Sequence, residues 1–509
     1  VRPPIPAPTM PIRASSPPGL VWVRARLAPK PMTPAATAAL LPERYGSARG
    51  GQAVKLLEVA IMAVAAAGFL THNVTLLLAM VFMMGLHSTL FGPLKYSILP
   101  QVLRADELVG GNGLIEMATF VAILAGTILG ASLIRIEGQG ALWVSLACIG
   151  LALAGLGTAL AMPRVAPAAP GLPIRWNLFA ETWDNLRRVR ANRTVFLSCL
   201  GISWFWFYGS IYFIQLPNYA RQVLGGDAGV FTLLLAVFSI GVAVGSLLCE
   251  RLSGHKVEIG LVPFGSIGMT VFGVDLYFAH RDVALLHDQA VMTLLAQPST
   301  WRVLADLALM AVFSGFYLVP LFALIQSRSA RDQVSRVIAA NNILNAAFMV
   351  LASVLAVVLL NRVGLTIPEL LLYTALLNAV VAVYIYTLVP EFLLRFVAWI
   401  VSNTLYRLRV EGLDKIPDEG PALIVCNHVS FMDPIILFGA ERRPIRFVMY
   451  YKIHQWFGLK WAFRAARAIP IAGRKEDEAM MERAFAEVDR ELAAGELVMI
   501  FPEGGITRD

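Results

Sequence analysis

The stretch GPLKYSILPQVLRADELVGGNGLIEMATFVAILAG, residues 92–126, returns in altered form as VPLFALIQSRSARDQVSRVIAANNILNAAFMVLAS, residues 319–353. In both copies an apolar segment ends near a proline, a charged loop follows, and the next apolar segment opens with an asparagine. The corresponding positions are Pro93 with Pro320 and Asn112 with Asn341. Two related halves in one membrane domain are therefore predicted. The alternative is that loops between membrane helices simply resemble one another.

The composition is that of an integral membrane protein. Of the 509 residues, 57% are hydrophobic and 15% charged, and the mean hydropathy is +0.67, whereas soluble domains carry about 25% charged residues. The net charge of +8 indicates basic cytoplasmic loops rather than binding to nucleic acid, which we do not expect. The four cysteines are widely spaced, so neither a disulfide framework nor a metal site is expected.

Ten apolar windows are long enough to cross a bilayer, which takes about 20 residues. They lie near 53–71, 74–92, 112–135, 140–162, 195–219, 229–250, 259–279, 302–325, 341–361 and 366–390. The arginine-rich connection 163–194 is predicted to be cytoplasmic, and so is everything after residue 390. The predicted membrane domain therefore covers 51–390, with halves at 51–162 and 195–390.

Both ends of the chain are expected to be incomplete. Residues 1–50 are rich in Pro, Ala and Arg and lack helical periodicity, so we expect an irregular segment. If each half held six helices, two would be absent before residue 53, which indicates a truncated or misread N-terminus. The chain stops at Asp509, on a loop just past a predicted strand, so its last domain is expected to be truncated as well.

Ionisable side chains within the apolar windows are candidates for a transport pathway, because burying a charge in lipid is costly. Glu58, Glu116, Asp275 and Asp306 are such residues. Glu58 follows Lys55 at helical spacing, so a local ion pair is an equal alternative. Glu116 is expected to face a central cavity.

From residue 391 to 509 the pattern changes to that of an α/β domain. Residues 391–417 predict an interfacial amphipathic helix that leads into a strand. Further strands are predicted at PALIVCN, IRFVMY, AIPIA and LVMIFP, and further helices at 452–467 and 476–494.

The polar motif of this domain is IVCNHVSFMDP, residues 424–434, on a turn from a strand to a helix. A histidine after a strand can act as a general base, and a carboxylate can fix its tautomer and stabilise the imidazolium. His428 and Asp433 are therefore the candidate catalytic pair. The alternative for Asp433 is a helix N-cap, with Pro434 at the first helical position.

Two later motifs offer groups for binding an anion. PIAGRKED presents Arg474 after a strand, where a guanidinium can hold a phosphate. IFPEGGITRD places Glu503, Gly504 and Gly505 on a tight turn, followed by Arg508. The alternatives are a solvated surface arginine and an ordinary turn.

The order N-H-x4-D, then G-R, then F-P-E-G with a following Arg resembles the glycerolipid acyltransferases, over about residues 410–509. The resemblance implies that His428 is the base and Asp433 its partner. It also implies a glycerol-phosphate site, whose residues here would be Asn427, Arg474, Glu503, Gly504, Gly505 and Arg508. The chain departs from the family pattern where Gly505 and Ile506 separate Gly504 from Thr507.

The membrane part resembles the lysophospholipid transporter branch of the major facilitator superfamily. The resemblance rests on GLHSTLFGPLKYSILPQ, DELVGGNGLIE and GSLLCERLSGHKVEIGLVPFG, and it covers about residues 50–390. It implies about ten of the twelve helices of that fold. In several bacteria such a transporter is fused to the acyltransferase, often with an acyl-carrier-protein synthetase domain downstream.

Together these features predict transport of a lysophospholipid to the cytoplasmic face of the bacterial inner membrane, followed by its re-acylation. The expected acyl donor is a thioester of acyl-carrier protein or coenzyme A, and no bound cofactor is expected. One alternative is a membrane-anchored 1-acylglycerol-3-phosphate acyltransferase without transport. The other is a solute efflux transporter with a non-catalytic cytosolic domain.

Overall fold

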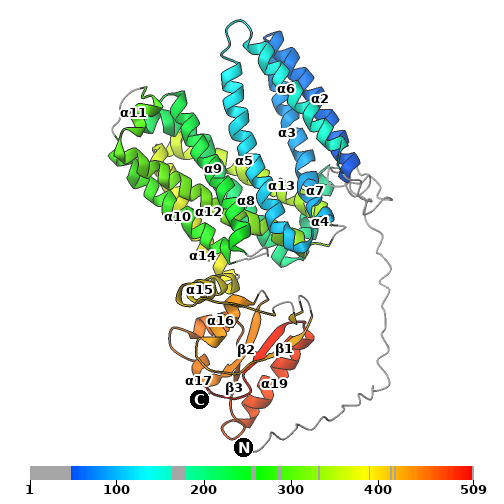
Figure 1. The fold of residues 1–509 in the computed structure, drawn as a ribbon, viewed down its shortest axis with the longest axis vertical. Coiled ribbons are helices and arrows are strands. Elements are labelled where there is room, and N and C mark those ends of the chain that lie inside the picture. Colours follow the sequence, from blue (N-terminus) through cyan, green and yellow to red (C-terminus); the bar gives the residue numbers. More distant parts are fainter. Residues whose placement is uncertain are drawn as a thin grey trace, which may run out of the picture.

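The computed structural model shows a bundle of long helices and a small α/β domain, with one helix lying between them (Figure 1). It describes residues 47–162, 178–253, 260–283, 288–330, 333–388, 390–412, 415–417, 420–441 and 443–506. The predicted irregular segment 1–50 overlaps the first helix at residues 47–50, and the rest of it lies outside the described residues.

The first half of the bundle contains four long helices, with two short ones between the second and third. They are α2 (Ser47–Leu70), α3 (Val74–Ser97), α4 (Leu99–Val102), η1 (Ala105–Glu107), α5 (Leu108–Leu133) and α6 (Gly140–Leu160). Most residues of the long helices are Leu, Ala, Val, Ile, Met or Gly. Such segments satisfy every backbone polar group within the helix, which a lipid environment requires.

The second half contains six long helices and four short elements. They are α8 (Arg193–Asn218), η2 (Tyr219–Val223), α9 (Ala228–Leu252), α10 (Leu261–Ala279), η3 (His280–Asp282), α11 (Val291–Leu295), α12 (Pro298–Arg328), α13 (Val334–Val358), η4 (Leu359–Val363) and α14 (Ile367–Leu388). In the described residues, ten helices are long and apolar enough to cross a membrane. This confirms the ten predicted windows, in the predicted order.

The arginine-rich linker 163–194 contains a helix that was not predicted. This helix, α7 (Leu178–Ala191), packs on α8 and α13. Asn192 follows it and caps α8, because its side chain accepts a hydrogen bond of 3.2 Å from the Val195 amide.

The two copies of the repeat meet at the end of the bundle that is nearer the α/β domain. Gln326 on α12 donates to the backbone carbonyl of Tyr96, at 3.1 Å, and exchanges hydrogen bonds of 2.6 and 3.1 Å with Asn112 on α5. The ring of Tyr96 stacks on that of Phe322, with the ring centroids 4.3 Å apart. The repeated segments therefore form part of the contact between the two halves, to which the packing of α5 on α9 also contributes.

The predicted boundaries inside the repeat were wrong. Pro93 and Pro320 lie inside α3 and α12. A membrane helix can continue past a proline, because groups on neighbouring helices satisfy the backbone carbonyl that loses its hydrogen bond. Asn112 and Asn341 do not open their helices either, since α5 begins at Leu108 and α13 at Val334. Both asparagines are fully buried.

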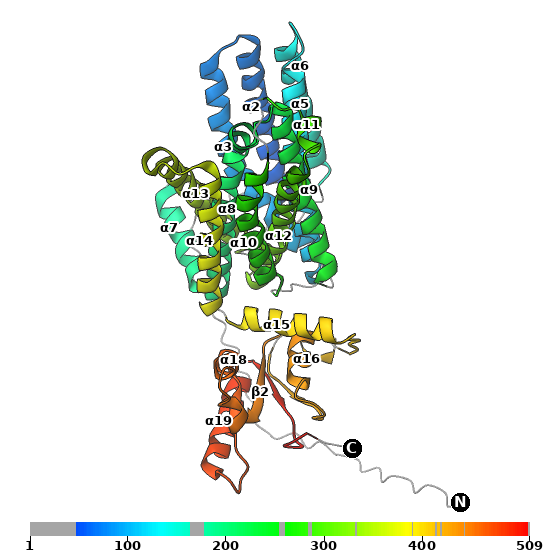
Figure 2. The ribbon, with the colours of Figure 1, turned by 90° about the vertical axis from the view of Figure 1, so that its left-hand side faces the viewer.

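Helix α15 (Pro390–Leu405) lies across the space between the bundle and the α/β domain (Figure 2). It contacts α10 and α14 of the bundle on one side, and α16 and α18 of the α/β domain on the other. The predicted amphipathic helix is confirmed. The strand predicted after it is wrong: residues 406–412 and 415–417 form no strand, and Tyr406 and Val410 are exposed rather than packed against a neighbouring strand.

The α/β domain is built on a four-stranded parallel sheet with the order β1-β4-β2-β3. Its elements are β1 (Ala422–Val425), α16 (Asp433–Ala440), β2 (Ile445–Tyr450), α17 (Tyr451–His454), α18 (Lys460–Ala465), β3 (Ile469–Ile471), α19 (Glu478–Ala493) and β4 (Leu497–Ile500). These bounds match the four strands predicted within the domain. The helix predicted at 452–467 is two short helices, α17 and α18.

Both faces of the sheet are covered, as is usual for parallel strands. Val448 and Val498 pack with Ala484 and Val488 of α19 on one face. On the opposite face, the side chains that alternate with these pack against α16, and they include Ile445, Phe447, Leu497 and Met499. The strands are thereby fixed in register, and the loops at their carboxyl ends are held at one edge.

Candidate functional site

The candidate catalytic residues lie at the carboxyl edge of the parallel sheet, the edge where open α/β sheets bind ligands. His428 follows β1, and Glu503 follows β4. These two strands are neighbours, with Val425 paired to Ile500 at their carboxyl ends. Parallel pairing therefore brings together two motifs that lie 75 positions apart in the chain.

His428 and Asp433 form a hydrogen-bonded pair across the loop. The imidazole Nδ1 lies 3.1 Å from Asp433 Oδ2, and both side chains are mostly buried. The carboxylate makes Nδ1 the protonated ring nitrogen, which directs the lone pair of the neutral imidazole to Nε2. This is the tautomer that a general base needs, with its basic nitrogen turned away from the carboxylate.

Asp433 holds the loop that carries His428 rather than capping α16, so the alternative N-cap interpretation was wrong. The residue before it, Met432, occupies the cap position, and Asp433 Oδ2 accepts hydrogen bonds of 2.8 Å from the amides of Val429 and Ser430. Burial raises the pKa of Asp433, but these hydrogen bonds and the one with His428 outweigh it and hold the pKa below its ordinary value. The carboxylate therefore stays ionised beside the imidazole.

Glu503 and Phe501 complete the surroundings of His428. The His428 backbone amide donates to Glu503 Oε2 at 3.0 Å. The ring of Phe501 stacks on the imidazole, with the centroids 4.4 Å apart. Gly504 has a φ of +65°, a conformation that favours glycine and lets the chain turn directly after Glu503.

The other predicted substrate-binding residues lie further out. Arg474 is exposed after β3, and its Nε lies 3.0 Å from Glu478 Oε1. β3 lies three strand positions from β1, roughly 14 Å at the usual strand spacing. Asn427 and Gly505 are exposed on their loops, and Arg508 lies outside the described residues.

A second polar group at the same edge was missed by the sequence analysis. Lys452 Nζ lies 2.9 Å from Glu476 Oε1, and the hydroxyls of Tyr450 and Tyr451 donate to the same carboxylate at 2.9 and 3.0 Å. The hydrogen bond with Glu476 raises the pKa of Lys452, and the hydrogen bond from Lys452 lowers the pKa of Glu476. The available signal was position: Lys452 follows the predicted strand IRFVMY, and this strand ends at the edge that carries His428.

In the membrane domain, Glu58 lies in a local cluster. Lys55 Nζ is 2.7 Å from Glu58 Oε2, and His87 Nε2 is 3.3 Å from the same oxygen. This is the local ion pair that the sequence left open as an alternative, extended by a histidine from α3.

Glu116 lies in the interior of the bundle, where it was expected to face a central cavity. It is buried and hydrogen-bonded to the hydroxyl of Tyr96. Lys95 lies close enough for an electrostatic interaction with Glu116, and its Nζ donates to Thr119 at 2.7 Å. The carboxyl group thus sits beside the contact that Tyr96 makes between the two halves.

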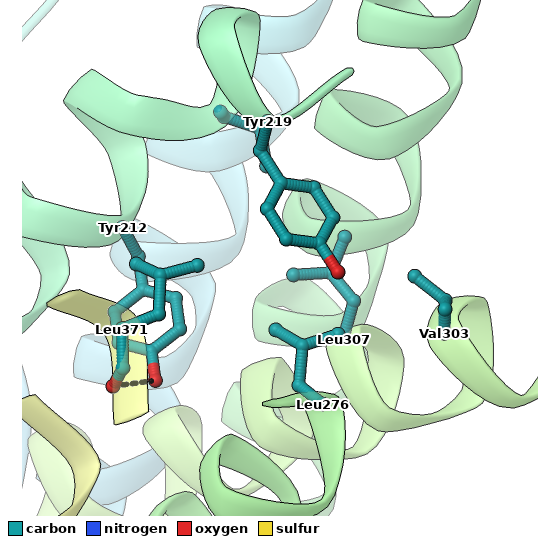
Figure 3. A pocket seen from close by; sticks show the side chains of 7 residues that line it. Tyr212, Tyr219, Leu276, Val303, Leu307 and Leu371 are labelled. Atoms are coloured by element: carbon teal, nitrogen blue, oxygen red, sulfur yellow. Dashed lines mark hydrogen bonds between the residues drawn. The ribbon is translucent and has the colours of Figure 1, made fainter. Parts of the chain in front are cut away.

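Asp306 is buried beside Asp275, whose carboxylate binds the Arg302 guanidinium at 2.6 and 3.1 Å. A cavity of about 10 Å³, room for one water molecule, lies in the same half (Figure 3). It is lined by Tyr212, Leu216, Tyr219, Leu276, Val303, Leu307 and Leu371. Glu58, Glu116 and Asp306 therefore lie in separate clusters with different partners.

Two family models match the chain, one for each part. Residues 47–286 match the Major Facilitator Superfamily, and residues 407–509 match the family described as Acyltransferase. The second match begins just after α15 and covers every residue of the candidate catalytic site.

Curated relatives of the membrane domain are lysophospholipid transporters named LplT. The protein from Pectobacterium carotovorum subsp. carotovorum is 30% identical over 249 residues, which are 48% of this chain and 56% of the relative. The protein from Enterobacter sp. (strain 638) is 29% identical over 253 residues, 48% of this chain and 57% of the relative. The chain thus spans a little more than half the length of these relatives.

Solved structures show the same fold in the membrane domain. A bacterial homologue of the iron transporter ferroportin, in an outward-facing state, aligns with a TM-score of 0.50 and 12% identity over 69% of this chain and 88% of that chain. The Escherichia coli fucose:proton symporter FucP aligns with a TM-score of 0.50 and 15% identity over 69% of this chain and 86% of that chain.

The protein is therefore a multi-pass membrane protein that joins a major facilitator domain to an acyltransferase domain. Its membrane domain is related to lysophospholipid transporters. The predicted fusion of these two kinds of domain is confirmed.

Proposed function

We propose that the protein carries a lysophospholipid across the bacterial inner membrane and re-acylates it at the cytoplasmic face. The observation that carries the proposal is the His428–Asp433 pair, held beside Glu503 in an acyltransferase domain. The same chain contains a membrane domain related to lysophospholipid transporters, so both activities would act on one class of lipid.

In the proposed reaction His428 Nε2 removes the proton from the free glycerol hydroxyl of the lysophospholipid. The hydroxyl oxygen attacks the carbonyl carbon of an acyl thioester, carried by acyl-carrier protein or coenzyme A. The tetrahedral intermediate then collapses, the carbon–sulfur bond breaks, and the imidazolium returns the proton to the departing thiolate. Asp433 stabilises the imidazolium while it carries that proton.

The phosphate of the substrate would bind along the carboxyl edge of the sheet. Lys452 follows β2, which is one strand closer to β1 than β3 is. Arg474 is exposed and held by Glu478, and it would meet a more distant part of the headgroup. We propose that Lys452 contacts the phosphate and that Arg474 assists it.

The test supplies labelled lysophosphatidylethanolamine to the outside of spheroplasts that contain the complete protein. Two quantities are followed: protection of the label from extraction by albumin, and its conversion to diacyl lipid. We expect His428→Ala to internalise the label without acylating it, and His454→Ala, a second histidine of the same domain, to do both. Acylation by His428→Ala would refute the assigned base.

The same spheroplasts, supplied with other substrates, separate the alternatives. Acylation of lysophosphatidate supplied inside, with no uptake of label from outside, would indicate an anchored acyltransferase that does not transport. Uptake of other solutes, with no acylation by the wild type, would indicate an efflux transporter with a non-catalytic domain.

A further inference from the structure

An exposed aromatic segment of the α/β domain runs from the end of α17 into the first two residues of α18. This segment, the aromatic loop, has the sequence QWFGLKW at residues 455–461. Trp456 and Trp461 are about half exposed, and Phe457 is completely exposed. Gly458, with a φ of +84°, allows the sharp turn that presents Phe457. Aromatic side chains gathered in this way on a surface mark an interaction site.

The aromatic loop adjoins the loop that carries His428. Trp456 lies against Phe431, with the ring centroids 6.3 Å apart. Phe431 is itself exposed, and it lies between His428 and Asp433 in the chain. An apolar surface therefore extends from the proposed base to the tip of the aromatic loop.

The aromatic loop also lies close to the membrane domain. It leads directly into α18, which contacts α15, and α15 contacts α10 and α14 of the bundle (Figure 2). Lys460 and Arg464 on α18 are exposed next to the aromatic side chains. Tryptophan is enriched at membrane–water interfaces, and lysine and arginine are attracted to anionic headgroups.

We infer that the aromatic loop inserts into the lipid interface beside the bundle and thereby places the mouth of the catalytic site at the bilayer surface. The lysophospholipid would then reach His428 with its acyl chain still surrounded by lipid. The consequence for the substrate rests on the proposed function, but the contact with lipid does not. The basic side chains and the proximity of α15 favour lipid over a protein partner as the occupant.

The first test measures the depth of the loop without using enzyme activity. In the full chain, Phe457 is replaced by cysteine, and an environment-sensitive fluorophore is attached to it. The labelled protein is then reconstituted in vesicles of phosphatidylethanolamine and phosphatidylglycerol. The control is Phe485→Cys, which places the label on an exposed aromatic position of α19. The wild-type chain, labelled in parallel, gives the background from its own cysteines.

We expect the label at position 457 to be quenched by nitroxide-bearing lipid and protected from a water-soluble quencher, and the label at 485 to show the reverse. Equal quenching of both labels by the water-soluble quencher would overturn the inference. Protection at 457 that requires added acyl-carrier protein would also overturn it, because the surface would then be a docking site for an acidic protein.

The second test compares two substrates in the Phe457→Ser, Trp461→Ser double variant. Both side chains are exposed, so the fold should be retained. We expect acylation of long-chain lysophospholipid in vesicles to fall roughly tenfold, because the loop loses apolar area for insertion, while acylation of a short-chain, water-soluble analogue is unchanged. Equal losses on both substrates would count against the inference. If the wild type acylates neither, the proposed function fails while the labelling experiment still decides the surface.

Discussion

Replacing Asp433 by asparagine tests how the carboxylate acts, because the substitution removes its charge and keeps its shape. Asp433 Oδ2 accepts from two backbone amides at 2.8 Å and faces His428 Nδ1 at 3.1 Å. An asparagine carbonyl oxygen placed at the same point can accept all three hydrogen bonds. We therefore expect Asp433→Asn to keep the loop and the tautomer, and to lose only the negative charge beside the imidazolium.

The size of the effect follows from that charge. Opposite charges about 4 Å apart near a protein surface attract by about 4 kcal/mol. Partial exposure of the pair to solvent reduces this to about 2–3 kcal/mol, which corresponds to a fall in kcat of roughly 30- to 160-fold. Two charge-assisted hydrogen bonds also become neutral ones, which lowers the free energy of unfolding by about 1–2 kcal/mol.

The assay measures initial rates of acyl transfer to lysophospholipid in proteoliposomes, together with thermal unfolding of the same preparations. Glu487→Gln, on the exposed face of α19, is the control and should behave as the wild type. A loss of about 10,000-fold, as for a triad aspartate whose replacement imposes the wrong tautomer, would refute the argument that the carbonyl replaces Oδ2. A change in kcat of less than about threefold would refute the role of the charge.

Three further predictions address the loop, its pH dependence and the repeat. Glu503→Gln should lower kcat by less than about tenfold, because the glutamine carbonyl can still accept the hydrogen bond from the His428 amide. Glu503→Ala removes the acceptor and should lower kcat further; initial rates of acylation by the two variants test this. Because the pKa of Asp433 is held below its ordinary value, its hydrogen bonds stabilise the domain fully above about pH 4, and this contribution is lost as the pH falls through the lowered value. The unfolding free energies of wild type and Asp433→Asn should therefore differ by a constant amount above about pH 4 and approach each other as the pH falls through the lowered pKa of Asp433. Gln326→Ala should lower the free energy of unfolding by about 1–3 kcal/mol, because Asn112 loses its buried partner; thermal unfolding in detergent checks it, and an unchanged midpoint would contradict it.

The sequence was sufficient for the four strands of the sheet and for the histidine–aspartate pair, although the strand predicted after α15 was wrong. The strands are short apolar runs bounded by polar loops, and the parallel sheet buries both of their faces. The contact of His428 with Asp433 crosses a single loop, so the spacing of the two residues was informative. By contrast, the exact ends of α5 and α13 were misread, because Asn112 and Asn341 resemble cap residues and are in fact buried inside their helices.

The strand order could not be predicted from the sequence, and it decides which residues share the site. Pairing of β1 with β4 places Glu503 against His428, whereas the position of β3 at the far side of the sheet moves Arg474 away. The same order puts β2, the strand that precedes Lys452, between β4 and β3. Parallel strands joined through helices can take several orders, and the hydrophobic pattern of each strand is the same in all of them.

The exposure of this edge suits an enzyme whose substrate arrives through a tethered domain. Arg474 and Lys452 are exposed cations that already have carboxylate partners, so the headgroup would compete with Glu478 and Glu476 for them. We expect such a site to bind a dissolved ligand weakly. Linking two modules raises the effective concentration of one for the other, to the millimolar range for short linkers. Here α15 joins the two parts, because it contacts α10 and α14 of the bundle as well as α16 and α18 of the α/β domain. Under the proposed function, catalysis would depend on delivery of the lipid beside the site more than on affinity for its headgroup. Cutting the chain after α14 should then reduce acylation of lipid in vesicles far more than acylation of a soluble analogue.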